Sequence, residues 1–301
     1  MTRALGAALL GAAVLALSAC TTPHAVAQPI PHPSASASES ASPSASPESP
    51  SPSAAPTSAS PKPKPSTAPP PPPPPGPGPL DCSGSASIDR PQATGPGPLG
   101  SVRVTGSEVV ALTFDDGPDP VNTPKILDLL RQCGVKATFC LEGAKAAANP
   151  TVVRRIASDG HTFCNHTWRH IRQLGTYGPD LIRQDLSDTN NAIRAIVPDA
   201  QIGYFRAPGG AWTEDYLLVA RELGMTPLHW HVDTRDWESS KWGKGQSMVD
   251  HIVSVVEAET HPGSVILSHD FQKPDTTAAY RILLPWLKAR FKLTALPPQG
   301  L

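Results

Sequence analysis

The first 113 residues of this 301-residue chain contain no phenylalanine, tryptophan or tyrosine. Charge is also scarce between Thr21 and Pro79, where proline, serine and alanine predominate. A segment without aromatic and branched apolar side chains cannot bury enough surface to offset the entropy lost on ordering. We therefore expect residues 20–100 to be a disordered linker, followed by one folded domain over residues 101–301.

The chain also lacks an excess of charge of either sign, since its formal net charge is −1. Nucleic-acid-binding proteins usually carry clustered basic charge, so nucleic acid is not an expected partner. Within the linker, Pro69–Pro75 is an unbroken proline run, which favours the extended polyproline II conformation. About 60 such residues would extend on the order of 150 Å.

Residues 1–19 have the pattern of an export signal. Arg3 is followed by an apolar run, Ala4–Leu17, that is short for a membrane-spanning helix. The run closes in Leu17-Ser18-Ala19-Cys20, which resembles a bacterial lipoprotein cleavage site. Cys20 is then the expected lipidated N-terminus, and the outer face of the cell membrane is the expected location. Ordinary cleavage after Ala27, which would release a soluble extracellular protein, is the alternative.

Four cysteines remain when Cys20 is set aside: Cys82, Cys133, Cys140 and Cys164. In the oxidising compartment that an exported protein enters, four cysteines indicate disulfides, with three possible pairings. None of the spacings is that of a zinc knuckle. Cys140 and Cys164 both lie near the ends of predicted strands, so we favour this pair.

From Glu108 onward, short apolar runs alternate with segments of helical periodicity. Val109–Phe114 and Ser264–Leu267 have the length and β-branched content of strands. The predicted helices are 124–133, 151–158, 179–196, 213–223, 247–259 and 279–291. Proline, serine or threonine at helix starts and glycine after several helix ends mark their limits. Strands that alternate with helices indicate parallel β/α units.

Polar residues follow each apolar run, at the C-terminal end of each predicted strand. A parallel barrel places its active site at these ends. The polar residues are Asp115-Asp116, Asn165-His166, Arg206, Asp233 with Asp236, and His269. We therefore predict a barrel-like parallel α/β domain. A flat, doubly wound sheet is the alternative, but no glycine-rich phosphate loop supports it.

His166 and His170 are four residues apart, so on a helical turn they would share one face and could hold one ion. A carboxylate from Asp115 or Asp116 would complete a site that leaves positions open for water and substrate. Neighbouring strand residues point to opposite sides, so the two aspartates could have different roles. Taken singly, each motif has an alternative explanation. His166 and His170 could be a coincidental surface pair, and Asp115 and Asp116 could simply cap the following helix.

Thr113–Pro118, which reads TFDDGP, resembles the first signature of the polysaccharide deacetylases of the NodB-homology type, carbohydrate esterase family 4. Four further segments resemble the remaining signatures, in the family's order: His166–His170, Arg206–Pro208, Asp233–Trp237 and Leu267–His269. The resemblance extends from about Glu108 to Leu296. It implies a distorted parallel (β/α) barrel and a metal-dependent hydrolase that removes acetyl groups from a polysaccharide.

The resemblance also implies a role for each motif residue. Asp116, His166 and His170 would hold one divalent ion, usually zinc, with cobalt or another divalent ion as alternatives. Asp115 would act as general base toward the attacking water and His269 as general acid toward the departing amine. These roles agree with the chemistry, because an amine leaving group needs a proton and histidine is the usual donor near neutral pH.

The remaining motif residues would support this chemistry. Arg206 would pair with Asp115, and Asp236 would hold His269 in its protonated form. Trp237 would wall the acetyl pocket, and the backbone N–H of Gly209 would stabilise the oxyanion. Ordinary core roles are the alternative for Arg206, Asp236 and Trp237. The chain departs from the family pattern at Gly209-Gly210, where an aromatic residue usually follows, so the wall of the substrate groove should differ.

Three functions fit these residues: an N-deacetylase of peptidoglycan or chitin-like glycans, an O-acetyl esterase of acetylxylan, and a non-catalytic carbohydrate-binding protein. Asp115 and His269 are needed for chemistry but not for metal binding, which disfavours the third. An enzyme tethered to the membrane by its N-terminal lipid meets its own cell wall at high effective concentration. We therefore expect peptidoglycan to be the substrate. We also expect the protein to be a monomer.

Overall fold

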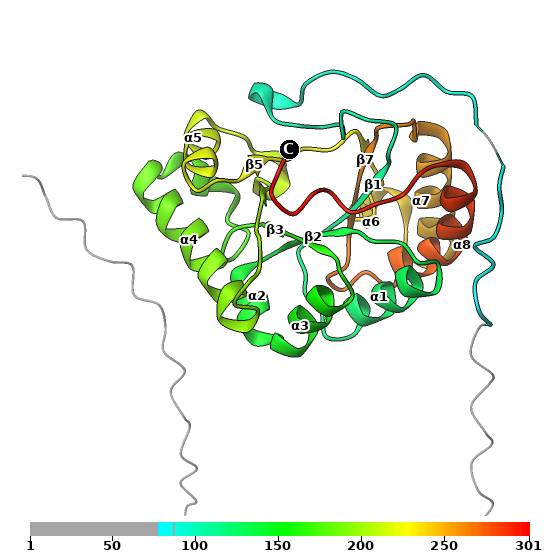
Figure 1. The fold of residues 1–301 in the computed structure, drawn as a ribbon, viewed down its shortest axis with the longest axis horizontal. Helices are drawn as coiled ribbons and strands as arrows, with labels where there is room; N and C mark the ends of the chain where they lie inside the picture. The colour runs from blue at the N-terminus through cyan, green and yellow to red at the C-terminus, as the bar shows by residue number, and fades with distance from the viewer. Residues whose placement is uncertain (1–77, 87) are drawn as a thin grey trace, which may run out of the picture. The chain divides into compact units, whose positions relative to one another are not determined.

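Seven parallel strands form the centre of the domain in the computed structural model, which describes residues 78–86 and 88–301 (Figure 1). The strands are β1 (Ala111–Asp115), β2 (Thr138–Leu141), β3 (Thr162–Asn165), β4 (Tyr204–Phe205), β5 (Thr226–Pro227), β6 (Val232–Asp233) and β7 (Val265–His269). Their order is β5-β4-β3-β2-β1-β7-β6. Strands that follow one another around the sheet in chain order give a barrel, here open between β5 and β6, so the predicted barrel-like fold is confirmed.

Eight α-helices accompany these strands within the described ranges, and they pack around the outside of the curled sheet (Figure 1). They are α1 (Asn122–Gln132), α2 (Gly143–Ala148), α3 (Pro150–Ser158), α4 (Pro179–Ile196), α5 (Glu214–Glu222), α6 (Ser239–Trp242), α7 (Gln246–Glu259) and α8 (Pro274–Arg290). The helix predicted over residues 179–196 is correct at both ends. The helix predicted from Ala279 begins five residues earlier, at Pro274, because proline suits a first helical turn even without an apolar stripe.

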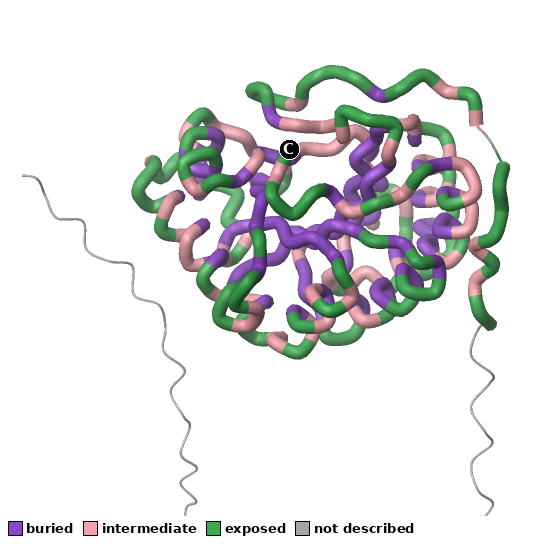
Figure 2. Tube along the Cα trace, viewed as in Figure 1, coloured by how far each residue is buried: buried purple, intermediate pink, exposed green. Residues whose placement is uncertain are grey.

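Apolar side chains form two clusters on the two sides of the sheet. Leu112 and Phe114 of β1 pack outward in the larger cluster, where the Phe114 ring lies 4.9 Å from that of Tyr280 in α8. Ala111 and Val265 belong to a smaller cluster inside the curl. Figure 2 shows the same division: the central strands are buried and the outer faces of the helices are exposed. Side chains that alternate along each strand are thus divided between the two clusters.

Both pairs of cysteines are joined by disulfides. Cys140 and Cys164 are direct neighbours in the register of β2 and β3, so the favoured pair is confirmed. The second disulfide joins Cys82 to Cys133 at the end of α1, across 51 residues of sequence. The first disulfide lies in the core of the curl, and the second ties the N-terminal segment to the domain.

The segment ahead of residue 101 packs against the domain, so the linker predicted for residues 20–100 ends too late. The Arg90 guanidinium donates hydrogen bonds of 2.8, 3.1 and 2.6 Å to the carbonyls of Glu257, Ala258 and Thr260, at the C-terminal end of α7. Such donors satisfy carbonyls that have no partner within the helix. The predicted signal, Cys20 and most of the predicted linker lie outside the described residues.

The segment ahead of β1 also pairs with residues that adjoin β5 and β7. Val102 forms a parallel bridge with Leu228, next to β5, and Val104 forms an antiparallel bridge with Ser264, next to β7. The Val102 N–H donates to the carbonyl oxygen of Pro227 at 2.8 Å, and the His229 N–H donates to that of Val102 at 2.6 Å.

Across the part of the chain that the structure describes, no helix combines the length and hydropathy that a membrane span needs.

Candidate active site

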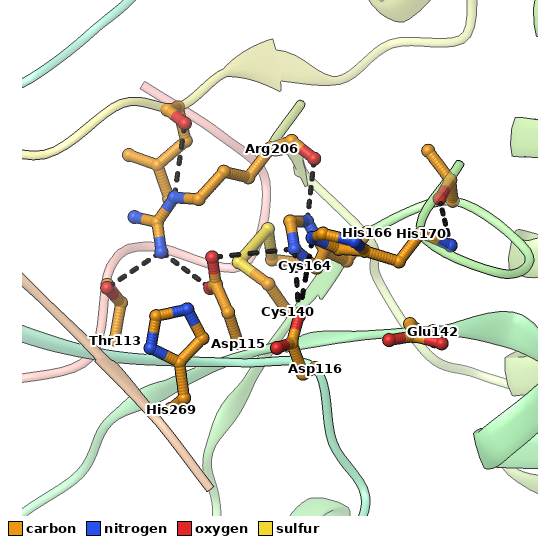
Figure 3. Close-up of polar contacts among 12 residues, drawn as sticks. Thr113, Asp115, Asp116, Cys140, Glu142, Cys164, His166, His170, Arg206 and His269 are labelled. Carbon is orange, nitrogen blue, oxygen red and sulfur yellow. Dashed lines mark hydrogen bonds and ion pairs between the residues drawn. A yellow bond between two sulfur atoms is a disulfide. The ribbon is translucent and has the colours of Figure 1, made fainter. Parts of the chain in front are cut away.

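A pocket of about 230 Å³ opens at the C-terminal ends of the strands. Most of the residues that the sequence nominates line it: Asp115, Asp116, His166, His170, Gly209, Trp237 and His269. The other two, Arg206 and Asp236, are buried beside it, at 0% and 3% exposure. Asp115 is the register partner of both His269 and Cys140, so adjacent strands bring these residues to one level (Figure 3).

Asp116, His166 and His170 form a cluster with the dimensions of a metal site. Asp116 Oδ1 lies 3.3 Å from His166 Nε2 and 3.6 Å from His170 Nε2. One ligand atom from each residue falls within 4.8 Å of the others. Ligands that each lie about 2.0–2.2 Å from one zinc ion would show separations of this size.

The chemistry of these three groups also fits a cation. His166 Nδ1 lies 2.8 Å from the carbonyl oxygen of Arg206, so Nδ1 carries the proton and Nε2 turns a lone pair toward Asp116. Asp116 Oδ1 is buried and has no hydrogen-bond donor. Burial opposes a charge on His166, but the nearby carboxylates of Asp115 and Asp116 raise its pKa overall, so they favour positive charge at Nε2, which a metal ion would supply in place of a proton. Two acceptors that face each other in a negative environment suit a bound divalent ion.

The two histidines do not lie on a helix, contrary to the prediction. Residues 167–169 form a turn in which Thr167 has φ 67°, and His170 follows with φ 55°. Such left-handed conformations cost free energy in residues other than glycine, so the surroundings must hold them. Asn165 Oδ1 accepts a hydrogen bond from the Thr167 N–H at 2.9 Å, and the Trp168 N–H donates to Asp185 at 2.8 Å.

Asp115 and Asp116 were predicted to point to opposite faces of one strand, but only Asp115 lies on the strand. Asp115 is the last residue of β1, whereas Asp116 lies beyond the strand in a left-handed conformation with φ 71°. This turn brings both carboxylates to the same pocket, so the expectation of opposite strand faces is wrong. Lys145 steadies the turn, because its Nζ donates to the Asp116 carbonyl at 2.9 Å and pairs with Glu142 at 2.7 Å.

Arg206 and Asp115 form a buried ion pair, with 2.7 Å between Nη1 and Oδ1. The guanidinium also donates to Thr113 Oγ1 at 2.9 Å and to the carbonyls of Leu228 and His229 at 3.2 and 3.1 Å. A buried pair is maintained when its remaining donors are satisfied in this way. The arrangement fixes the orientation of the Asp115 carboxylate.

His269 and Asp236 form a second pair, with 2.6 Å between Nδ1 and Oδ1. Asp236 Oδ2 accepts from the backbone N–H of His269 at 2.8 Å and from Thr276 Oγ1 at 2.6 Å. Burial alone would lower the pKa of His269, but the Asp236 carboxylate raises it to about 9. His269 therefore carries a proton at neutral pH and can donate it.

The wall of the pocket contains residues that sequence reasoning missed. Arg172 and Trp230 line it beside Gly209 and the half-exposed Trp237. Arg172 follows the second histidine by two residues, a spacing that could have drawn attention to it. Trp230 lies between β5 and β6, outside every motif, so nothing in the sequence distinguished it from a core tryptophan.

Known proteins resemble this chain in both sequence and structure. A polysaccharide deacetylase family model matches residues 103–228. A chitooligosaccharide deacetylase from Sinorhizobium fredii is 40% identical over 206 residues, which cover 64% of this chain and 92% of the relative. The chain belongs to the polysaccharide deacetylase family. The fold and the deacetylase activity predicted from the sequence are therefore confirmed.

Two further proteins extend the comparison of this deacetylase to cell-wall enzymes. A peptidoglycan-N-acetylglucosamine deacetylase from Bacillus cereus is 34% identical over 185 residues, 60% of this chain and 82% of the relative. The crystal structure of a peptidoglycan N-acetylglucosamine deacetylase superposes with a TM-score of 0.57 at 35% identity, covering 65% of this chain and 89% of that one.

Proposed function

We propose that this deacetylase removes N-acetyl groups from the amino sugars of cell-wall peptidoglycan. One observation carries the mechanism: a single pocket joins the Asp116–His166–His170 cluster to the two pairs Asp115–Arg206 and His269–Asp236. A site for a metal alone would need neither pair. Their presence beside the cluster supports hydrolysis over carbohydrate binding with a structural metal.

Asp116, His166 and His170 would hold one divalent ion. Two imidazoles and one carboxylate form a donor set typical of catalytic zinc, so zinc is the proposed ion, with cobalt or another divalent ion as alternatives. When bound, the ion would act as a Lewis acid that polarises the acetamide carbonyl and lowers the pKa of the attacking water.

Asp115 is the proposed general base. Its carboxylate, oriented by Arg206, accepts a proton from water while the water oxygen bonds to the carbonyl carbon of the acetamide. The carbonyl oxygen then carries a negative charge. The backbone N–H of Gly209, which lines the pocket, would donate a hydrogen bond to that oxygen.

His269 is the proposed general acid. As the bond between carbonyl carbon and nitrogen breaks, His269 transfers its proton to the nitrogen, and the products are acetate and a free sugar amine. Asp236 holds the imidazole in place and raises its pKa. Trp237 forms the outer wall of the pocket that would receive the acetyl methyl group.

The location proposed for the enzyme supports peptidoglycan as substrate. The apolar run that ends at Cys20 favours export and lipidation at the outer face of the membrane, with the linker ahead of residue 78 as a tether. Two disulfides agree with folding in an oxidising compartment. The Bacillus cereus relative is a peptidoglycan deacetylase. We propose a monomer that contacts the membrane through its lipid.

Chitin oligomers are a second candidate substrate, because the Sinorhizobium fredii relative is a chitooligosaccharide deacetylase. The test is acetate release from peptidoglycan fragments, chitin oligomers and acetylxylan by the zinc-loaded protein, with Asp115→Asn as the inactive control. We expect release from peptidoglycan to be fastest and the variant to be at least about 10²-fold slower. Release from acetylxylan alone would contradict the proposal.

A further inference from the structure

Arg172 is the one charged side chain on the pocket wall that has no partner among the described residues. It begins the short 3-10 helix Arg172–Thr176, two residues after His170. No hydrogen bond or ion pair joins its guanidinium to residues 78–86 or 88–301. The other charged groups of the pocket have close neighbours of their own. Asp115 pairs with Arg206, and His269 pairs with Asp236. Asp233 accepts from the Arg235 N–H and the Trp237 indole N–H, and Asp116 belongs to the cluster with His166 and His170.

Arg172, an exposed residue, lies against Gly209. A Cβ atom built on Gly209 would lie 2.8 Å from Arg172 Nε and 3.0 Å from its Cζ. The guanidinium therefore occupies the space that a side chain at position 209 would take. Gly210 leaves room in the same way, since its Cβ would lie 2.8 Å from the Trp230 ring. The two glycines that stand where the family pattern has an aromatic thus let Arg172 and Trp230 form this wall.

Arg172 lines the same pocket as the proposed catalytic residues Asp115 and His269. Gly209 is the proposed donor to the acetamide oxygen, so a sugar bound for reaction would bring its neighbouring ring substituents next to the guanidinium. Arginine presents two parallel N–H groups that match a carboxylate. A carboxylate on the carbon next to the acetamide, such as the lactyl ether of muramic acid, would be within reach, as would one on the adjoining sugar.

We propose that Arg172 binds a carboxylate of the glycan and makes the enzyme prefer an acidic acetamido-sugar chain over a neutral one. This inference rests on the proposed deacetylation of peptidoglycan and specifies which feature of that substrate is recognised. A neutral chitin oligomer would leave the guanidinium without a partner.

The test compares three variants on three substrates. Arg172→Met removes the charge and keeps most of the length, and Arg172→Lys keeps the charge without the planar fork. Arg221→Met is the matched control, because Arg221 is an exposed cation on α5, away from the pocket. The substrates are a peptidoglycan tetrasaccharide with free lactyl carboxylates, the same compound methyl-esterified, and chitotetraose.

We expect Arg172→Met to lower kcat/KM for the free-carboxylate substrate by about 10- to 100-fold, the range for a hydrogen bond to a charged group. Activity on the esterified and neutral substrates should stay within about twofold, Arg172→Lys should recover part of the loss, and Arg221→Met should match wild type. Mass spectrometry of the product identifies the source of the carboxylate. Loss of acetyl from the muramic acid sugar places it on the reacting sugar, and loss from glucosamine places it on the neighbour.

Equal losses on all three substrates would show that Arg172 only shapes the wall, and an unchanged rate on the free-carboxylate substrate would show that it binds no carboxylate. Either result overturns the inference while leaving the deacetylase activity intact. Metal content and melting temperature of each variant must match wild type for this comparison. If wild type released acetate only from acetylxylan, the proposed function itself would fail, and this inference with it.

Discussion

His166 contributes to the site through both of its ring nitrogens. Nδ1 meets the Arg206 carbonyl at 2.8 Å, and Nε2 lies 3.3 Å from Asp116 Oδ1. The same Arg206 orients Asp115, the proposed base. The proposed metal ligands and the proposed base are therefore coupled through one residue of the arginine motif, and the backbone contact keeps His166 in the tautomer that can bind a metal.

Replacing His166 with alanine should remove a metal ligand and reduce zinc occupancy to background, while the domain stays folded. The control is His251→Ala, since His251 stacks on Trp242 outside the pocket. Elemental analysis of the two purified variants measures the effect. Full zinc occupancy in His166→Ala would show that the ion binds elsewhere.

The pH dependence of activity should report on the His269–Asp236 pair. Asp236 raises the pKa of His269 to about 9, so the general acid is protonated below that pH and activity declines above it. Asp236→Asn removes the carboxylate, while burial, which lowers the pKa, remains. The alkaline limb of kcat/KM should then move to lower pH by more than about one unit.

The His269–Asp236 pair should also make the free energy of unfolding depend on pH. The folded-state pKa of His269 is raised from 6.5 to about 9, so its contribution is complete below pH 6.5 and is lost as the pH rises through about 9. Asp236→Asn should therefore lose stability mainly on the acid side of this window. If the alkaline limb of kcat/KM did not move in Asp236→Asn, a group other than His269 would supply the proton.

At the scale of secondary structure, α8 illustrates both the reach and the shortfall of sequence reasoning. Its apolar residues predicted a helix from Ala279, but the true start at Pro274 matters for function, because it places Thr276 against Asp236 at 2.6 Å. A polar first turn carries no apolar periodicity, so only the tertiary contact reveals it. α2 and α6 were missed for a related reason: each is too short to show a helical repeat.

The candidate site shows a similar division. The motif residues were nominated correctly as pocket neighbours, because parallel strands bring their C-terminal ends to one edge. The left-handed conformations of Asp116, Thr167 and His170 left no trace in the sequence, because none of these residues is glycine. The contact between Arg172 and Gly209 joins segments 37 residues apart and was equally invisible.

The Cys82–Cys133 disulfide should stabilise the domain through the segment ahead of residue 101. It closes a loop across 51 residues, and its loss should cost about 2–4 kcal/mol, or roughly 5–15 °C in melting temperature. We expect this loss in a Cys82→Ser/Cys133→Ser variant, measured by calorimetry. Its acetate release at 25 °C should match wild type, because neither cysteine lines the pocket. An unchanged melting temperature would contradict the assigned role.

For the whole molecule, the proposed anchor precedes the described residues. If Cys20 is lipidated, the mature protein should carry a diacylglycerol at that residue, because one acyl chain alone gives only marginal membrane binding. Cys20→Ala should abolish this modification and release the enzyme from the membrane fraction. Mass spectrometry of the mature N-terminus measures the outcome, and an unmodified N-terminus at Gln28 would indicate the soluble form instead.

The central claim joins the site to its substrate and is tested most directly by the free-amine content of the wall glycan. The measurement compares cells that lack the gene, cells complemented with the wild-type gene, and cells complemented with Asp115→Asn at equal protein level. We predict that the free-amine content falls without the gene, is restored by wild type and is not restored by the variant. An unchanged free-amine content in the cells without the gene, or full restoration by Asp115→Asn, would contradict the account.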